Sequence, residues 1–193
     1  GGSIRGALHS AVAIELFHNA FLVHDDVEDG SLNRRGLPTL AAEFGLPIAV
    51  NVGDAMNVLS IGPLMKNLET LGATLTWRVF EEIEHMVRET VEGQAIELGW
   101  VRDNPFDLND EDYLRMTLKK TCWYTCIHPC RIGGLIGAGT SLDLDRFNRF
   151  GYFMGAAFQI QDDLLNLAGD EAKYGKEIGG DIWEGKRTLV LIH

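Results

Sequence analysis

Two blocks of carboxylates are the residues of this sequence best suited to chemistry. The first contains Asp25, Asp26 and Asp29, and the second contains Asp162 and Asp163. On a helix, Asp25 and Asp29 stand one turn apart on the same face, where their like charges repel each other. A divalent cation offsets that repulsion, and Mg2+ prefers one or two carboxylates together with water and phosphate oxygens. The two blocks therefore predict a site that holds a diphosphate through metal ions.

Five basic side chains would neutralise the diphosphate charge that the metal ions leave uncovered. They are Arg34, Arg35, Lys120, Lys176 and Lys186. Each feature also has an ordinary explanation. An acidic helix end is usually a solvated surface, and His18 on an apolar helix is usually a satisfied, half-buried side chain. The occurrence of all these features in one order, with an apolar helix before each carboxylate block, favours the diphosphate site.

The elements that would position these groups follow from apolar residues at helical spacing. The pattern predicts an all-α fold of about seven helices, without a strand. Both carboxylate blocks belong to apolar helices, the first at the end of residues 7–29 and the second within residues 143–168. Further helices are expected over residues 48–71, with a bend or break at Gly62-Pro63, over residues 74–98, and after an N-cap at Asn109. A turn-prone basic loop is expected over residues 33–38.

The composition is that of a globular protein. The chain has 193 residues, of which 46% are hydrophobic and 23% charged, so it is large enough for one sizeable core. We therefore expect residues 1–193 to form a single domain, and we expect it to be truncated at both ends. A formal net charge of −11 argues against a nucleic-acid surface, which would need a basic footprint.

The cysteines and the apolar runs indicate where the protein resides. Cys122, Cys126 and Cys130 recur at every fourth residue and would stack along one side of a helix. They could ligate a metal or carry redox chemistry, but no CxxC pair supports this, so buried small side chains are the favoured interpretation. An odd number of thiols fits a reducing compartment.

No signal peptide and no apolar run of membrane-spanning length is expected, which predicts a soluble cytoplasmic protein.

The segment HDDVEDGSLNRRG, residues 24–36, resembles the first aspartate-rich motif of the trans-isoprenyl diphosphate synthases, or polyprenyl synthetases. Later segments resemble the same family in the same order, and together they cover nearly the whole chain. They are Gly53-Asp54, Gly93-Gln94, Lys120-Thr121, FQIQDD at residues 158–163 and GKEIGGDIWEGKRT at residues 175–188. The resemblance implies the all-α isoprenoid synthase fold, in which helices surround a deep apolar cavity with the two motifs at its mouth.

The resemblance also implies a role for each candidate residue. For the metals, it implies that Asp25 and Asp29 bind two Mg2+ ions, with Asp26 nearby. Asp162 would bind a third, with Asp163 in its outer shell. The remaining matches concern the substrates. Arg34, Lys120 and Lys176 would bind the allylic diphosphate; Arg35 and His18 would bind isopentenyl diphosphate; Lys120, Thr121 and Gln159 would lie beside the reacting carbons; Asp181 and Lys186 would belong to the phosphate-side loop.

The reaction implied is a Mg2+-dependent condensation of isopentenyl diphosphate with an allylic diphosphate, carried out by a homodimer. The allylic C–O bond ionises, the double bond of isopentenyl diphosphate attacks the cation, and the departed diphosphate removes the final proton. Product length would depend on Phe21, one turn before Asp25, with small Ala20 beside it and Phe17 as a deeper floor. This pattern favours a geranylgeranyl over a farnesyl product.

Two departures from the family pattern keep alternatives open. The second motif ends in Asn166 where the family usually has Asp, which predicts altered metal binding. A Gly-Lys-Arg element that the family places upstream of the first motif is not present. A class I terpene cyclase is one alternative, although residues 162–170 do not reproduce its second metal motif. The other is a non-catalytic subunit that binds prenyl diphosphate or partners an active synthase.

Overall fold

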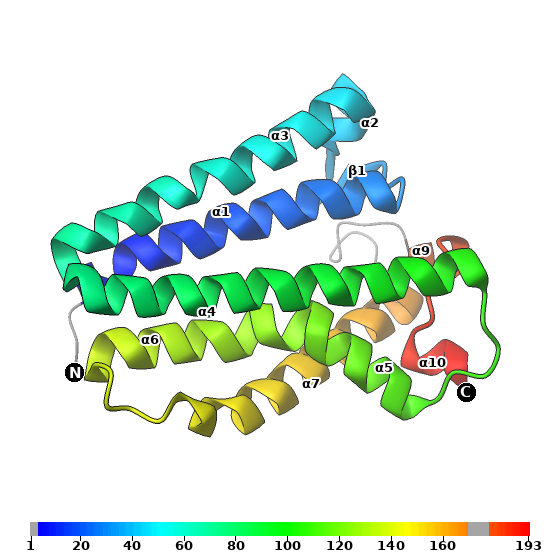
Figure 1. Ribbon diagram of the computed structural model, residues 1–193. Coiled ribbons are helices and arrows are strands. Elements are labelled where there is room, and N and C mark those ends of the chain that lie inside the picture. The colour runs from blue at the N-terminus through cyan, green and yellow to red at the C-terminus, as the bar shows by residue number, and fades with distance from the viewer. Residues whose placement is uncertain (1–3, 170–177) are drawn as a thin grey trace. The chain divides into compact units, whose positions relative to one another are not determined.

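The computed structural model describes residues 4–169 and 178–193, and it confirms the all-α prediction (Figure 1). The longest helices are α1 (Ile4–Glu28), α4 (Ile61–Asp103) and α7 (Asn148–Ala168). The shorter ones are α2 (Leu40–Phe44), α3 (Leu46–Leu59), α5 (Asp110–Thr117), the π-helix η1 (Leu118–Ile127), α6 (His128–Ala138), the 3-10 helix η2 (Leu144–Phe147), α9 (Gly180–Trp183) and α10 (Leu189–Ile192).

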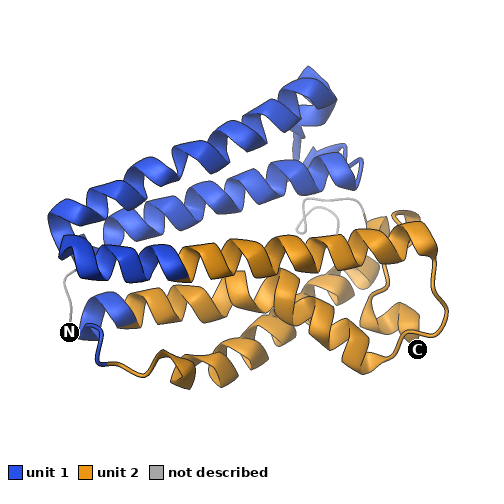
Figure 2. Cartoon of the chain, in the orientation of Figure 1, with its two compact units in different colours: residues 1–81, 135–141 blue, residues 82–134, 142–193 orange. Residues whose placement is uncertain are grey.

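The chain divides into two compact units, coloured separately in Figure 2. Unit 1 comprises residues 1–81 and 135–141, and unit 2 comprises residues 82–134 and 142–193. The first carboxylate block belongs to unit 1 and the second to unit 2. Each unit is described by itself, and the single domain expected from the sequence stays a prediction.

In unit 1, α1 packs against α3, and nearer its N-terminus it contacts the start of α4, where Asn67 Nδ2 donates to Ser10 Oγ at 3.0 Å (Figure 1). Ala13 and Ala20 on α1 have no exposed surface, because small side chains let the two helices approach closely. Gly53 on α3 lies directly against the ring of His24, and a β-carbon there would clash with that ring. The Gly53-Asp54 motif is thus explained by packing, together with a 3.4 Å contact between His24 Nε2 and Asp54 Oδ1.

A short hairpin follows α1 where the sequence predicted only a loop. Its strands are β1 (Asn33–Arg34) and β2 (Leu37–Pro38), with Arg34 opposite Leu37. The two turn residues between them have positive φ angles, 54° at Arg35 and 76° at Gly36. A two-residue turn of this kind matches the twist of antiparallel strands. The expectation of no strand was therefore wrong at this one place, and the hairpin turns the chain back toward the end of α1.

In unit 2, α7 packs against η1 at close range. Gly151 and Gly155 on α7 lie against Ile127 and Cys122, and a β-carbon at either glycine would clash. Cys122 is completely buried and its thiol donates to the Tyr152 carbonyl oxygen at 3.5 Å. All three cysteines are free thiols, and Cys122 is the fully buried one. This agrees with the interpretation of small packing side chains.

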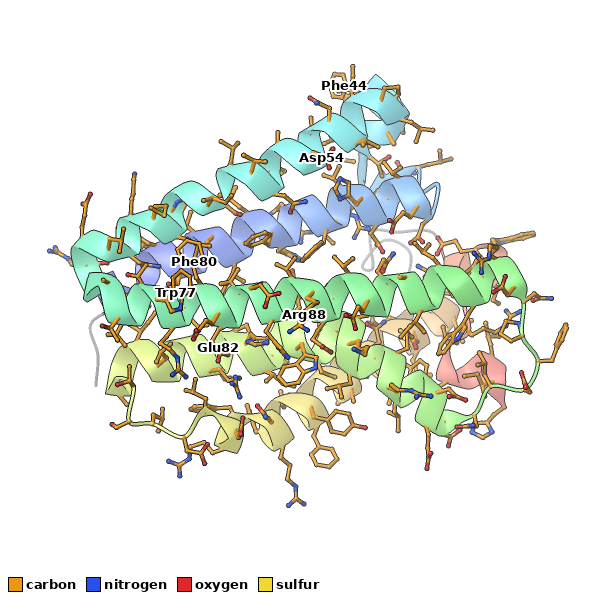
Figure 3. All side chains as sticks on the ribbon, in the orientation of Figure 1. Phe44, Asp54, Trp77, Phe80, Glu82 and Arg88 are labelled. Carbon is orange, nitrogen blue, oxygen red and sulfur yellow. The ribbon has the colours of Figure 1, made fainter. Side chains whose placement is uncertain are left out.

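A buried polar network joins α4 to α6 within unit 2. Glu82, labelled in Figure 3, accepts hydrogen bonds from both Nε (2.6 Å) and Nη2 (2.9 Å) of Arg131. His128, which is 1% exposed, lies 2.8 Å from the same carboxylate through Nδ1 and 2.9 Å from His85 Nδ1 through Nε2. Burial raises the pKa of Glu82, but the bonds from His128 and Arg131 outweigh this and lower it to about 2. The network holds a carboxylate charge inside the protein.

Helix boundaries follow the local signals in the sequence. Asn109 caps α5, because its side-chain oxygen accepts hydrogen bonds from the backbone N–H groups of Glu111 and Asp112. The Asp112 carboxylate accepts a hydrogen bond from the Asn109 backbone N–H in return. The bend or break expected at Gly62-Pro63 lies next to a helix boundary, since α3 ends at Leu59 and α4 begins at Ile61. A second interruption was not predicted: Gly72, whose φ is 76°, is non-helical within α4. The polar helix predicted over residues 74–98 is the central part of α4.

Two described helical stretches, Ile4–Glu28 and Leu46–Asp103, are long and apolar enough to cross a membrane by length and composition. The sequence had predicted no run of that length. The criterion is weak evidence, because core helices of soluble proteins also meet it.

Candidate functional site

The first acidic motif ends α1 in an electrostatically unfavourable place. Asp25, Asp26 and Glu28 lie in the last turn, which holds no basic residue, although the carboxyl end of a helix carries a partial negative charge. Asp29 follows directly, and its backbone N–H donates to the Asp25 carbonyl oxygen at 2.8 Å. The four carboxylates at this end therefore need a compensating cation from elsewhere in the chain.

Arg34 is the cation that the hairpin supplies. Its Nε donates to Asp26 Oδ1 at 2.8 Å, and its Nη2 donates to Asp25 Oδ2 at 3.1 Å. Asp26 is only 5% exposed, and burial of an unpaired carboxylate would be costly. Burial also lowers the pKa of Arg34, but its bonds to Asp26 and Asp25 reverse the effect, so the net direction is upward. The structure thus brings Asp25, Asp26 and Arg34 together.

Arg35 and His18 occupy different surroundings in unit 1. Arg35 is exposed on the hairpin turn. His18 is half-buried on α1, and burial lowers its pKa, as do the charges of Arg35 and Arg34, while Glu15 raises it. The net direction is downward, which favours a neutral imidazole that can donate or accept a hydrogen bond.

The three residues assigned to product length lie on α1 below the acidic motif. Phe17 is 9% exposed and Ala20 is fully buried. The rings of Phe17 and Phe21 are stacked, with centroids 6.4 Å apart and an interplanar angle of 24°. Phe21 precedes Asp25 by four residues, so the stacked pair continues the helix face that carries this carboxylate.

The donor chemistry of both motifs suits a hard divalent cation, because every candidate ligand is a carboxylate oxygen. In the part of the chain that the structure describes, no three His, Cys, Asp or Glu side chains converge on a point where all could hold one metal ion. Mg2+ does not require such a cage, since it usually keeps several waters and binds through one or two carboxylates and phosphate oxygens. The residues present therefore fit Mg2+ carried in with a phosphate ligand.

In unit 2 a continuous chain of hydrogen bonds joins four side chains from three helices. Thr121 Oγ1 on η1 donates to Gln159 Oε1 on α7 at 2.7 Å. Gln159 Nε2 donates to Asp163 Oδ1 at 2.9 Å, and Tyr113 on α5 donates to Asp163 Oδ2 at 2.6 Å. Three of the four were predicted site residues, and the structure brings them together. Asp162, the neighbouring predicted ligand, is half-buried on the same helix.

Asp163 is the acceptor on which this chain ends. It is 5% exposed. Burial raises the pKa of Asp163, the bonds from Tyr113 and Gln159 lower it, and the net direction is upward. Burial and the adjacent carboxylate also raise the pKa of Tyr113, so the phenol keeps its proton for donation. Both oxygens of Asp163 accept hydrogen bonds from protein groups, which agrees with a place outside the direct coordination shell of a metal.

Lys120 and its neighbour are held by acidic side chains of α4. Lys120 Nζ pairs with Glu97, which is 8% exposed. Lys119 Nζ lies 2.9 Å from Glu89 Oε2 and 2.8 Å from Glu92 Oε2. Gly93 lies against the Lys120 backbone, where a β-carbon would clash with the main chain. The glycine of the Gly93-Gln94 motif is therefore required for α4 to approach the π-helix, a helix type often found at functional sites.

Asn166, the last residue of the second motif, makes a contact that stabilises the fold. Asn166 is 2% exposed, and its Oδ1 accepts the backbone N–H of Asp181 at 3.1 Å. Its own backbone carbonyl accepts from Gly179 at 2.6 Å. Nearby, Lys186 Nζ lies 2.8 Å from Glu184 Oε2 and 3.9 Å from Asp181 Oδ1. The Asn166 side chain thus fixes the start of α9, a use that the sequence did not predict. Lys176 lies outside the described residues.

Two contributors were missed by sequence reasoning. The sequence analysis gave no role to Tyr113, in the helix predicted after Asn109, or to Glu97, in the helix predicted over residues 74–98. One signal was available for Tyr113: it precedes Thr121 by eight residues, so on a continuous helix the two would lie on nearly the same face. For Glu97, no pattern in the sequence distinguished it from the other glutamates of α4.

Known proteins of one family resemble this chain. The family model for polyprenyl synthetase matches residues 2–193, so the chain belongs to the polyprenyl synthetase family. The chain is 34% identical over 193 residues to a geranylgeranyl diphosphate synthase of Saccharolobus solfataricus, and covers 57% of that protein.

Two solved structures resemble the whole chain. One is a geranylgeranyl pyrophosphate synthase from Corynebacterium glutamicum, complexed with isoprenyl diphosphate and magnesium, with a TM-score of 0.89 at 29% identity. The other is a polyprenyl synthase from Caulobacter crescentus, complexed with calcium and isoprenyl diphosphate, with a TM-score of 0.85 at 29% identity. Each match covers all of this chain, and 57% and 56% of those chains respectively. The chain thus spans somewhat more than half the length of the relatives it matches.

Proposed function

We propose that this protein is a Mg2+-dependent trans-prenyltransferase. It condenses isopentenyl diphosphate with an allylic diphosphate to make a short all-trans prenyl diphosphate, with geranylgeranyl favoured over farnesyl. The observation that carries the proposal is the acidic end of α1 with Arg34 bonded to Asp26 and Asp25, in a chain of the polyprenyl synthetase family. An acidic cluster held by its own arginine is suited to a metal-bound phosphate ligand, because Mg2+ and the guanidinium together balance the added charge.

The diphosphate-binding groups act by charge. Asp25 and Asp29 would hold two Mg2+ ions and Asp162 a third, with Asp26 and Asp163 supporting them. When bound, Mg2+ supplies Lewis-acid stabilisation of the leaving diphosphate. Arg34, Lys120 and Lys176 bind the oxygens of the allylic diphosphate, and Lys186 contributes from the phosphate-side loop. The carboxylate partner of Lys120, Glu97, holds the ammonium in place before the substrate arrives.

The second substrate is bound by Arg35 and His18. Arg35 is exposed on a tight turn whose backbone geometry is fixed by positive φ angles, so its position depends little on the rest of the loop. A neutral His18 donates one ring N–H to a phosphate oxygen without adding charge near Arg34 and Arg35, whose charges already lower its pKa.

The groups beside the reacting carbons act by dipole. Thr121 presents an oxygen atom rather than a donor to its surroundings, because its one hydroxyl proton is donated to Gln159 Oε1. Gln159 uses one of its two Nε2 protons on Asp163, and its Oε1 keeps a second lone pair. Oxygen dipoles favour an allylic cation. The double bond of isopentenyl diphosphate attacks that cation, and the departed diphosphate takes the final proton. We also propose that the protein acts as a cytoplasmic homodimer.

Product length depends on Phe21. Its ring is stacked on that of Phe17 one turn further from the acidic end, and together they block the path of a chain growing away from Asp25. Replacing Phe21 with Ala removes the first block, so Phe21→Ala is expected to shift the product toward longer chains. An unchanged product distribution, measured by chromatography of the dephosphorylated products, would exclude Phe21 as the limit.

The proposal is tested by incubating the complete protein with isopentenyl diphosphate, Mg2+ and, in turn, dimethylallyl, geranyl and farnesyl diphosphate. Elongated linear products with each accepted primer are expected, and chelation of Mg2+ abolishes them. Cyclic hydrocarbons from the primer alone would identify a terpene cyclase. Binding of the diphosphates without any elongated product would identify a non-catalytic subunit.

A further inference from the structure

We infer that Tyr113 is a positioning residue for the condensation, acting through Asp163 on the amide of Gln159. The inference rests on the proposed function, since it assigns Gln159 and Thr121 to the reacting carbons. It adds a residue, and a task for the second aspartate of the motif, that neither the family pattern in this sequence nor the resemblance supplied.

The inference rests on which group donates and which accepts in each of the three side-chain hydrogen bonds. Tyr113 donates to one oxygen of Asp163 and Gln159 donates to the other, while Thr121 donates to Gln159. Two of the three donors therefore bond directly to one buried carboxylate, and the third, Thr121, is linked to it through Gln159. Each oxygen of Asp163 therefore accepts one hydrogen bond from a neutral donor.

Asp163 thereby fixes which way the Gln159 amide faces. An amide can rotate by half a turn and exchange its NH2 for its oxygen at nearly the same volume. Rotation here would place Gln159 Oε1 against Asp163 Oδ1, two acceptors 2.9 Å apart, and would leave the Thr121 hydroxyl facing an NH2 group. The carboxylate selects the orientation in which oxygen faces Thr121.

Tyr113 in turn fixes the carboxylate. The Tyr113 side chain is 1% exposed and projects from α5, whereas Asp163 belongs to α7. Without the phenol hydroxyl, Asp163 Oδ2 would be a buried acceptor without this 2.6 Å partner, and the carboxylate could rotate about its side-chain torsion. A hydrogen bond to a buried charge is among the strong ones in proteins, so the phenol restrains the whole chain of donors.

The consequence for catalysis is a set of oriented dipoles. With the Thr121 proton donated to Gln159 and one Gln159 N–H donated to Asp163, the oxygen atoms of Thr121 and Gln159 keep lone pairs for the reacting carbons. Dipoles that are already oriented cost no reorganisation when charge develops in the transition state. The negative charge of Asp163 also polarises the chain in the sense that favours a cation.

The competing interpretation is that Tyr113 only ties α5 to α7. That role would make the phenol hydroxyl matter for stability and would leave the chemical step untouched once the protein is folded. The two interpretations predict different outcomes for the kcat of Tyr113→Phe, for the energetic coupling between Tyr113 and Gln159, and for the mobility of the Gln159 amide.

The test is a double-mutant cycle in the complete protein with Tyr113→Phe, Gln159→Leu and both. Tyr113→Phe is expected to lower kcat roughly 10-fold, below the loss for a group that contacts the reacting atoms, with the KM of both substrates unchanged within about two-fold. In the Gln159→Leu background the second change is expected to add less than about a two-fold loss, because the amide it positions is gone. Tyr152→Phe, on α7 but outside this hydrogen-bonded chain, is the matched control and keeps wild-type kcat.

Two kinetic results would overturn the inference. One is an unchanged kcat in Tyr113→Phe, and the other is losses that multiply fully in the double variant. A spectroscopic arm works without turnover: the side-chain NH2 resonances of Gln159, assigned by their loss in Gln159→Leu, are expected to shift and broaden in Tyr113→Phe. Unchanged Gln159 resonances would also overturn it. If the wild-type protein elongated no primer, the proposed function would fail, whereas the NMR arm would still decide the role of Tyr113 in the network.

Discussion

The two acidic motifs divide their work in the same way but anchor it differently. In each pair of adjacent aspartates, the second is buried and bonded to protein groups, with Asp26 and Asp163 both 5% exposed. The first of each pair, Asp25 or Asp162, is half-buried. Successive residues of a helix point about 100° apart, so one carboxylate faces inward and the other remains accessible to a ligand.

The anchors differ in charge. Asp26 is held by the guanidinium of Arg34, whereas Asp163 is held by the neutral donors Tyr113 and Gln159. A cationic partner cancels the carboxylate charge on the spot. Neutral donors leave the carboxylate charge uncancelled. Their dipoles are oriented by it, with the negative ends facing away from the carboxylate. The first motif is therefore built to accept a charged metal-bound ligand, and the second to present negative ends of dipoles to a cation.

The accessible aspartates are where the largest effect is expected. Asp25→Asn removes a metal-binding charge, and a metal ion at such a site stabilises the transition state by several kcal/mol. We therefore expect kcat/KM to fall by about 1000-fold or more, corresponding to about 4 kcal/mol. Steady-state kinetics over a Mg2+ titration measures the loss. Glu28→Gln, an exposed neighbour on the same helix end, is the control and retains activity; an equal loss there would mean that total charge, and not Asp25, matters.

The anchoring cation of the first motif is tested through stability. Arg34→Ala leaves Asp26 buried without its guanidinium, and breaking such a pair costs about 3–5 kcal/mol when fully buried. Because Arg34 retains 24% exposure, a loss of about 2–3 kcal/mol in the free energy of unfolding is expected without Mg2+. Urea denaturation measures it, with Arg78→Ala in the exposed pair to Glu81 as the control, worth below about 1 kcal/mol. Equal losses in the two variants would refute the anchor role.

A third buried carboxylate, Glu82, lies outside both motifs and is anchored by a cation, Arg131. Its pKa of about 2 in the folded protein lies below the ordinary 4.5. A depressed carboxylate pKa adds stability that is present above pH 4.5 and is lost as the pH falls toward 2. Glu82→Gln is expected to cost at most about 3 kcal/mol at pH 6, and the difference from wild type should shrink below pH 4.5.

The control for Glu82 is Glu84→Gln. Glu84 lies on the same helix, is 67% exposed and pairs with Arg88 at 3.3 Å; Arg88 is labelled in Figure 3. Unfolding free energies measured at a series of pH values should show no comparable convergence for this variant. A constant offset between Glu82→Gln and wild type from pH 6 to pH 3 would contradict the assigned pKa.

Much of the fold and part of the site were predictable from the sequence. Apolar spacing located both carboxylate helices, and side-chain capping located the start of α5 at Asn109. The hairpin was missed because its signal is the backbone geometry of Arg35 and Gly36, and arginine rarely adopts a positive φ. Tyr113 and Glu97 were missed because their roles depend on partners 50 and 23 residues away in the chain, and spacing rules reach only one or two helical turns.

The smallest expected effects concern Asn166, the third position of the second motif. Asn166→Ala removes the acceptor for the Asp181 N–H and should cost about 1–2 kcal/mol of stability. Asn166→Asp keeps an acceptor there, so it should cost less than the alanine variant, although the added charge lies near Asp181. Because the side-chain oxygen is used by α9, we expect the Mg2+ concentration that gives half-maximal activity to change by less than about two-fold in Asn166→Asp. Thermal denaturation and a Mg2+ titration measure the two effects. A several-fold shift in the Mg2+ requirement would show that this position reaches the metal, and the second motif would then resemble the first more closely than its hydrogen bonds indicate.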